Sequence, residues 1–277
     1  MNLKQIAIRT PYYVVTGGLA IIFLTPLVWS AVASVSPHPS TNQRDGYGFG
    51  NFETLASGGG IGATLPQFVM NSLTVSAMTV VFTLFLAVFA GYAFARFQFP
   101  GKNALFLMVL AILMIPPATL LVPMYALMNL VGLSNSLVGV SVFITLFQLP
   151  FAIFMMRIAF EAIPVELEES ALVDGCTFFG ALRRVMLPAA VPGLVTVGLF
   201  SFLAAWNDLL APLMILRDPA TYVLPQAVTI LRQGVMGTVD FGITQAGVMI
   251  LALPCVFLFL TLQRYYVKGF MSGALKG

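Results

Sequence analysis

Residues 164–188, PVELEESALVDGCTFFGALRRVMLP, form the one long polar stretch in a chain that otherwise consists of apolar runs. Charged residues make up only 8% of the 277 residues, yet several of them gather here. They are Glu166, Glu168, Glu169, Asp174, Arg183 and Arg184. A charged side chain near the centre of a bilayer costs about 2.5 to 3.5 kcal/mol even on lenient scales. The stretch is therefore predicted to be a loop in water that joins two membrane-spanning runs.

The same stretch carries local signals for two short helices. Pro164 suits the first position of a helix, where its missing N–H would have no partner. Gly175 suits a helix end, because glycine adopts the left-handed conformation that many helix ends require. Thr177 then suits the cap of a second helix, which stops at Pro188. The pattern predicts a helix, a glycine turn and a second helix, a compact structure that contacts a partner.

The spacing within this loop resembles the EAA loop of the permeases of ABC importers. That motif reads E-A-A, three residues, G, nine residues and I-x-L-P, and here Ser170 replaces the first alanine and Val185 the isoleucine. The resemblance implies that the loop is a coupling helix that docks into a cleft of a separate cytoplasmic ATPase. The ATPase-coupling residues would be Glu168, Glu169, Ser170, Ala171, Asp174, Gly175, Leu187 and Pro188. An ordinary amphipathic cytoplasmic loop of another membrane protein is the alternative.

Composition identifies an integral membrane protein, because 59% of the residues are hydrophobic. At about 20 residues per spanning helix, the chain has room for about six spans with short loops. We expect an all-α, polytopic membrane protein with a single transmembrane domain over residues 1–277. Its six transmembrane helices are expected at about 12–35, 67–94, 103–123, 137–156, 189–216 and 241–262.

Two features between these runs also carry expectations. Pro116-Pro117 lies inside the third run, so a kink or a broken helix end is expected there. The segment from the first run to about Pro66 is rich in Pro, Gly, Ser and Asn, and is expected to be a water-exposed loop.

The distribution of basic residues gives an orientation. If the N-terminus is cytoplasmic, ten of the 13 Lys and Arg residues lie inside, and only Arg44, Arg217 and Arg232 lie outside. This bias agrees with the positive-inside rule. It places both termini and the 164–188 loop in the cytoplasm, where an ATPase would meet the loop.

The sequence lacks the residues for several other functions. It contains no GxxxxGK[ST] motif for binding ATP, and its only histidine, His38, has no neighbouring ligands for a metal or a triad. No catalytic or metal-binding residue is therefore expected. Cys176 and Cys255 suggest no disulfide framework. The basic residues sit beside spans rather than in a run, so no nucleic-acid partner is expected.

Trp206-Asn207-Asp208, in the outer half of the fifth run, is the candidate contact for a solute. A carboxylate and an amide exchange hydrogen bonds with hydroxyls, and an indole face stacks on C–H groups, so the group suits a sugar. The alternative is that Trp206 belongs to the interfacial aromatic belt and that Asp208 caps or pairs locally. Further polar residues at span edges complete the candidate path, with a structural role as the alternative for each: Asn71, Tyr125 and Gln148.

Further stretches resemble the carbohydrate-importer branch of these permeases, which includes the membrane subunits of the maltose transporter. They are Asn71-Ser72-Leu73, ARFQFPGK (95–102), VPMYALMNLVGLSNS (122–136), WNDLLAPL (206–213) and RYYVKGFMSGALKG (264–277). The resemblance implies the type I ABC importer permease fold and a multi-pass location in the bacterial cytoplasmic membrane. It also implies three partners: a second homologous permease, a dimeric cytoplasmic ATPase that binds ATP and Mg²⁺, and an extracytoplasmic sugar-binding protein or lipoprotein. This chain itself would bind no cofactor.

The expected function is ATP-driven import of a mono- or oligosaccharide. An importer of a non-sugar solute such as glycerol phosphate is the closest alternative. An anionic solute would favour a basic outer cavity, and Arg217 and Arg232 alone do not decide between the two. Proton-coupled carriers normally bury charged residues in their spans. No pair of acids lies inside an apolar run of this chain, so an ATP-independent carrier or channel is disfavoured.

Overall fold

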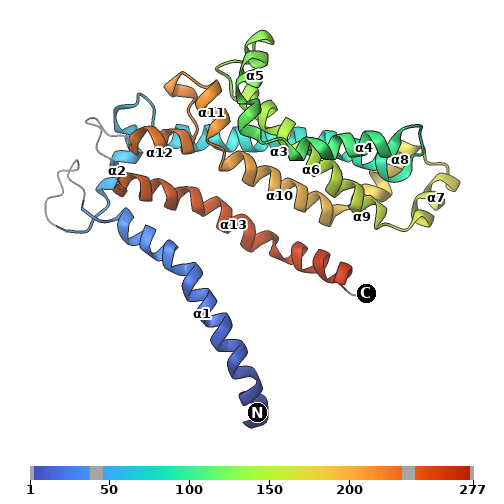
Figure 1. Cartoon of the computed structure of the whole chain (residues 1–277), viewed down its shortest axis with the longest axis horizontal. Helices are drawn as coiled ribbons and strands as arrows, with labels where there is room; N and C mark the ends of the chain where they lie inside the picture. Colours follow the sequence, from blue (N-terminus) through green and yellow to red (C-terminus); the bar gives the residue numbers. More distant parts are fainter. Residues whose placement is uncertain (1–2, 38–45, 233–240, 275–277) are drawn as a thin grey trace. The chain divides into compact units, whose positions relative to one another are not determined.

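The computed structural model describes residues 3–37, 46–232 and 241–274, and His38 lies outside these ranges. The described residues are almost entirely helical and include no β-strand, which confirms the predicted all-α class (Figure 1). The helices are α1 (Leu3–Ser34), α2 (Gly50–Ala56), α3 (Leu65–Arg96), α4 (Lys102–Ala111), α5 (Pro117–Leu130), α6 (Leu137–Glu161), α7 (Val165–Val173), α8 (Phe178–Ala181), α9 (Leu187–Ala189), α10 (Val191–Trp206), α11 (Leu210–Ile215), α12 (Leu224–Arg232) and α13 (Phe241–Ala274). Shorter segments are the 3-10 turns η1 (Gly58–Gly60), η2 (Ile112–Met114) and η4 (Pro219–Thr221), and the π-helical η3 (Leu182–Met186).

The chain divides into two compact units, and each is described by itself. The first unit is drawn from Met1–Leu65 and Ala227–Ala252, and the second from Pro66–Gln226 and Leu253–Gly277.

In the first unit, a buried asparagine ties α2 to the end of α1. The side-chain Nδ2 of Asn51 donates to the carbonyl oxygens of Ser34 at 2.9 Å and Ser36 at 3.0 Å. Gly242 lets α13 approach this amide closely, because a Cβ there would lie 2.5 Å from the Asn51 Nδ2. The expectation of an open, water-exposed loop before Pro66 is wrong for this part, since α2 buries Asn51 and Leu55. The polar composition of this segment did not predict a helix. Its tertiary contact with the end of α1 is made by a buried polar side chain, that of Asn51.

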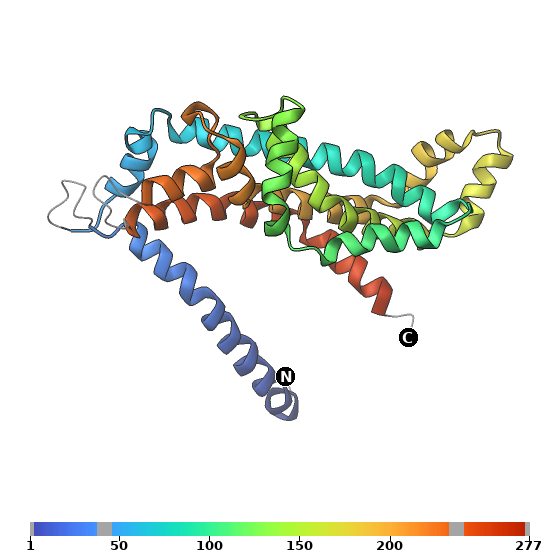
Figure 2. The same cartoon turned by 45° about the horizontal axis from the view of Figure 1, so that its top comes forward.

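In the second unit, α3 packs against α6 and α10 through small residues. A Cβ on Gly91 of α3 would lie 2.6 Å from the Cβ of Met156 in α6. Gly198 of α10 faces Leu84 of α3 with ordinary van der Waals spacing. Buried side chains such as Tyr92, Phe160 and Met186 form the core at the end of the unit that carries α7 and α8, yellow in Figures 1 and 2.

Four described helices are long and apolar enough to cross a membrane: Tyr12–Ser34, Leu65–Arg96, Leu137–Glu161 and Phe241–Gln263. Two bent pairs raise the number to six if each pair counts as one span. Lys102–Met114 and Pro117–Leu130 meet at 102°, and Phe178–Ala189 and Val191–Trp206 meet at 78°. The first bend, visible where the green α5 leaves α4 in both views, confirms the break predicted at Pro116-Pro117 (Figures 1 and 2).

The fifth apolar run differs from the continuous helix expected over 189–216. Helix α10 ends at Trp206, and α11 begins at Leu210. The carboxylate of Asp208 accepts a hydrogen bond from the backbone N–H of Ala211 at 2.8 Å, so it satisfies a donor at the start of α11. The polar residues of the run therefore lie in a break between two helices.

Candidate functional site

The turn that ends α7 has the geometry expected from its glycine. Gly175 adopts a φ of +87°, and the backbone N–H groups of Gly175 and Cys176 donate to the carbonyls of Leu172 and Ala171, both at 3.0 Å. These two bonds satisfy carbonyls that would otherwise lack partners at the helix end. Nothing lies within 4 Å of a Cβ placed on Gly175, so the tip of the turn is open on its outer side.

The second helix of the loop starts at the predicted cap. The hydroxyl of Thr177 accepts a hydrogen bond from the backbone N–H of Gly180 at 3.1 Å, and α8 begins at Phe178. The chain then passes through η3 and α9 and bends before α10. Helix, glycine turn and helix are thus confirmed as the local structure of the loop.

The two faces of the loop have different surroundings. Most of the candidate coupling residues are exposed, namely Glu169, Ser170, Asp174, Gly175 and Pro188, while Leu187 is half-buried and Ala171 is buried. Large apolar side chains lie exposed beside them: Val165, Leu167, Val173, Phe178 and Phe179. Exposed apolar residues rimmed by charge are typical of a surface that binds another protein.

Glu168 is the exception among the candidate coupling residues, because its side chain points into the protein and is only 6% exposed. One carboxylate oxygen, Oε2, lies 2.9 Å from the Nε of Arg96, at the end of α3. The hydroxyl of Tyr92 donates to the other oxygen, Oε1. The guanidinium of Arg96 also donates from Nη2 to the carbonyl of Ile163 at 2.6 Å. Glu168 therefore joins the loop to α3 rather than lying on the exposed face.

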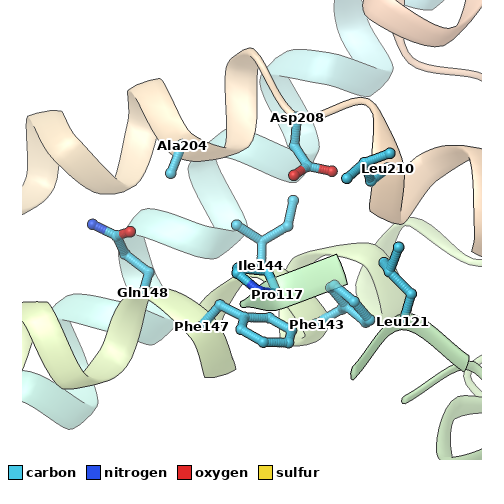
Figure 3. Close-up of a pocket in the computed structure, with 9 residues that line it drawn as sticks. All are labelled: Pro117, Leu121, Phe143, Ile144, Phe147, Gln148, Ala204, Asp208 and Leu210. Atoms are coloured by element: carbon cyan, nitrogen blue, oxygen red, sulfur yellow. The ribbon is translucent and has the colours of Figure 1, made fainter. Parts of the chain in front are cut away.

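A second candidate region is a small pocket bounded by α5, α6, α10 and α11. Its volume is about 120 Å³, and its polar lining residues are Gln148 and Asp208, as Figure 3 shows. Apolar side chains, including Phe143, Ile144 and Phe147, line the rest. A wider, shallow depression shares Gln148 and Ala204 with this pocket and adds Phe151, Phe200 and Leu203. The described region thus combines an acid, an amide and aromatic rings.

The rest of the Trp206-Asn207-Asp208 group does not line the pocket. Trp206 is fully buried and its ring stacks on Phe202 with centroids 5.6 Å apart. Asn207 is exposed and donates to the carbonyl of Leu203. Only Asp208 of the three faces the cavity.

Asn71 and Tyr125 hold the segment after α11 instead. The amide of Asn71 donates to the carbonyls of Ala220 and Tyr222, each at 2.9 Å. The hydroxyl of Tyr125 is hydrogen-bonded to the guanidinium of Arg217. These contacts match a structural role for Asn71 and Tyr125, which is the alternative to a role on the solute path.

Some of the contacts have no sequence signal that would have found them. Tyr92 and Glu168 are 76 positions apart, and neither belongs to a local motif that points to the other. Among the described residues, no group of three His, Cys, Asp or Glu side chains lies close enough to hold a metal ion.

Comparison with known proteins agrees with this geometry. Residues 84–271 match the family model described as the binding-protein-dependent transport system inner membrane component. The chain is 33% identical over 272 residues to the trehalose transport system permease protein SugB of Mycobacterium tuberculosis, covering 97% of this chain and 98% of that protein. It is 38% identical over 210 residues to the diacetylchitobiose uptake system permease protein DasC of Streptomyces coelicolor, covering 76% and 75%.

The fold is similar to that of a solved bacterial ABC transporter involved in import of the acidic polysaccharide alginate. The TM-score is 0.72 at 18% sequence identity, over 96% of this chain and 99% of the other. The matching family model covers most of the spans and the whole 164–188 loop. The chain belongs to the family of binding-protein-dependent transport system inner membrane components.

Proposed function

We propose that this chain is one of two permease subunits of an ATP-driven importer that carries a sugar across the bacterial cytoplasmic membrane. A dimeric cytoplasmic ATPase would bind ATP and Mg²⁺, and an extracytoplasmic binding protein would deliver the sugar. The names of similar proteins support a sugar, since they refer to uptake of trehalose, diacetylchitobiose and arabinooligosaccharides.

The exposed face of the 164–188 loop carries this proposal. Glu169 and the exposed apolar side chains of Val165, Leu167 and Val173 lie on α7 beside one another, and this mixed apolar and acidic surface suits docking into a groove of the ATPase. The left-handed turn at Gly175 brings the two short helices together at this face. ATP binding by the ATPase would then move the loop and shift the spans between inward- and outward-facing states.

The pocket favours a neutral, hydroxylated solute. Its described lining includes one carboxylate and one amide and no basic side chain. A carboxylate accepts hydrogen bonds from hydroxyl groups, an amide both donates and accepts, and aromatic rings pack against the C–H face of a sugar. We assign Asp208 and Gln148 as solute contacts on the transport path. An anionic solute such as glycerol phosphate is disfavoured by Asp208.

A pull-down of the tagged chain from its native membrane in mild detergent tests the proposal. The wild-type chain should bring down an ATPase and a second permease. Gly175→Asp should lose the ATPase while the protein remains in the membrane, because the new side chain adds charge and bulk at the tip of the docking face.

Gly101→Asp is the matched control. Gly101 also has a positive φ, of +77°, and also has open space where a Cβ would lie, but it sits in the turn between α3 and α4. The backbone strain is therefore similar in the two variants, and only the location differs. Normal recovery of the ATPase with Gly175→Asp, or equal loss with both variants, would contradict docking at this turn.

A further inference from the structure

The buried ion pair between Arg96 and Glu168 connects a membrane span directly to the loop that faces the ATPase. We propose that it is a latch that makes α3 move with the coupling loop, so that movement of the ATPase reaches the solute path. This inference rests on the proposed function and concerns residues that act behind the docking face.

The geometry of Arg96 suits this role because one guanidinium holds α7 at two points. Its Nε pairs with the Glu168 carboxylate at 2.9 Å, and its Nη2 holds the Ile163 carbonyl, just before α7, at 2.6 Å. The guanidinium is a rigid plane, so the ion pair to Glu168 and the hydrogen bond to Ile163 act from fixed positions on one group. The side chains of Arg96 and Glu168 are only 12% and 6% exposed, which limits screening by salt.

The carboxylate has a further partner on α3. The hydroxyl of Tyr92 donates to the oxygen of Glu168 opposite the ion pair. The Tyr92 ring packs edge-on against Phe97 and Phe160, with centroids 5.6 Å and 5.5 Å away. Both oxygens of Glu168 are thus held by side chains from the last two turns of α3.

The second helix of the loop is fastened to the same end of α3 by aromatic contacts. Phe178 packs against Phe97 with ring centroids 5.6 Å apart, and Phe179 stacks on Phe89 at 6.4 Å. The two halves of the loop therefore reach α3 from both sides of Gly175. With contacts on both sides of Gly175, a displacement of the loop would move the end of α3 with it.

A second ion pair offers a matched control. It also joins an arginine to a glutamate, but both residues belong to one helix, so it does not join two elements. Arg157 and Glu161 pair at 2.7 Å within α6, four positions apart, with side chains 23% and 42% exposed. Glu161→Gln and Glu168→Gln are the same chemical change. Only Glu168→Gln removes a charge that joins two elements.

The test uses the full chain with its own partners in right-side-out membrane vesicles loaded with ATP and vanadate. The native Cys176 and Cys255 are replaced by serine, and Leu210→Cys, at a half-exposed position in the pocket lining, reports access for a membrane-impermeant maleimide. Labelling is compared with and without ATP, and retention of the ATPase is measured by pull-down of the same samples.

In the Glu168→Gln variant, the ATP-dependent gain in labelling should fall by about tenfold, while the ATPase is retained. Glu161→Gln should leave both readouts as in the wild type. Arg96→Lys keeps the buried charge balance but lacks the planar fork, so it should retain the ATPase and lose part of the gain. This second variant separates transmission from any misfolding caused by an unpaired Arg96.

Two results would overturn the latch alone. One is an undiminished ATP response in both Glu168→Gln and Arg96→Lys, and the other is loss of the ATPase with Glu168→Gln, which would place Glu168 in docking. A wild-type chain that retains no ATPase would overturn the proposed function, and the latch with it.

Discussion

A close approach of α3 to α6 depends on the absence of a side chain at Gly91. A Cβ there would lie 2.6 Å from the Cβ of Met156 and 3.0 Å from the backbone nitrogen of Arg157. Neither neighbour is the flexible end of a side chain, so the helices themselves would have to shift. The glycine thus permits the close contact of the two spans at this point.

Gly91→Ala should lower the stability of the protein by about 1 to 3 kcal/mol, the usual cost of overpacking a well-packed interior. The midpoint of heat-induced aggregation in detergent would fall accordingly. Gly198→Ala is the control, because its Cβ would meet Leu84 at 3.6 Å, an ordinary contact distance. Equal midpoints for the two variants would show that α3 and α6 separate without cost.

The residues that the sequence predicts well are those whose role is local. Gly175 and Thr177 shape their own turn and cap, so their type and spacing are sufficient evidence. Glu168 could not be separated from Glu169 in the same way, because both lie in one motif. The difference between them comes from Arg96 and Tyr92, which reach Glu168 only through the tertiary fold.

At the scale of elements, the break between α10 and α11 places a carboxylate in the pocket. Asp208 has two roles there, since it accepts a hydrogen bond from Ala211 and lines the cavity. Asparagine is as good a helix cap as aspartate, but it carries no charge and has one acceptor oxygen fewer. The two roles can therefore be tested separately.

Asp208→Asn should keep the thermal stability of the wild type and reduce sugar uptake by about tenfold, from weakened contacts to solute hydroxyls. Asp208→Ala should reduce uptake and also cost about 1 kcal/mol of stability from the lost cap. Uptake is measured in membrane vesicles with the sugar that the co-purified binding protein retains. Full uptake by Asp208→Asn would assign the residue to capping alone.

Sequence predicted the helix break at Pro116-Pro117 and missed the break between α10 and α11 for a physical reason. Pro116-Pro117 removes backbone donors, so the bend after η2 follows from residue type. The break at 207–209 contains no proline or glycine, and its flanks are as apolar as a span. An aspartate inside an apolar run was the available signal, and it left a solute contact and a local cap as open alternatives, without locating the break.

For the whole molecule, the charged residues of two long apolar helices, α3 and α6, lie at one end of each helix, which is compatible with the proposed ATP-driven import. Arg96 is the one charged residue of α3, at its last position, and those of α6, Arg157 and Glu161, lie in its last two turns. A proton-coupled carrier normally buries ionisable groups near the middle of its spans. Hydropathy was enough to predict an all-α membrane protein with long apolar helices. The partner subunits are separate chains, so their identity cannot be read from this sequence.

Uptake by the purified complex in proteoliposomes should therefore require ATP and Mg²⁺ on the side of the ATPase. A protonophore should leave the initial rate unchanged, because no proton gradient is used. A non-hydrolysable ATP analogue serves as the control and should support no continued uptake. Sustained uptake without ATP, or its collapse with the protonophore, would favour a secondary carrier.

The π-helical turn at Leu182–Met186 limits which insertions and deletions this part of the chain can accept during evolution. A π turn holds one residue more than the α turn it replaces, and each α-helical residue rotates the chain by about 100°. Side chains before and after η3 thus follow different phases of the apolar repeat. Loss of one residue here would restore a regular helix but rotate the loop's face relative to α10, so the length of this turn should be retained while its side chains drift.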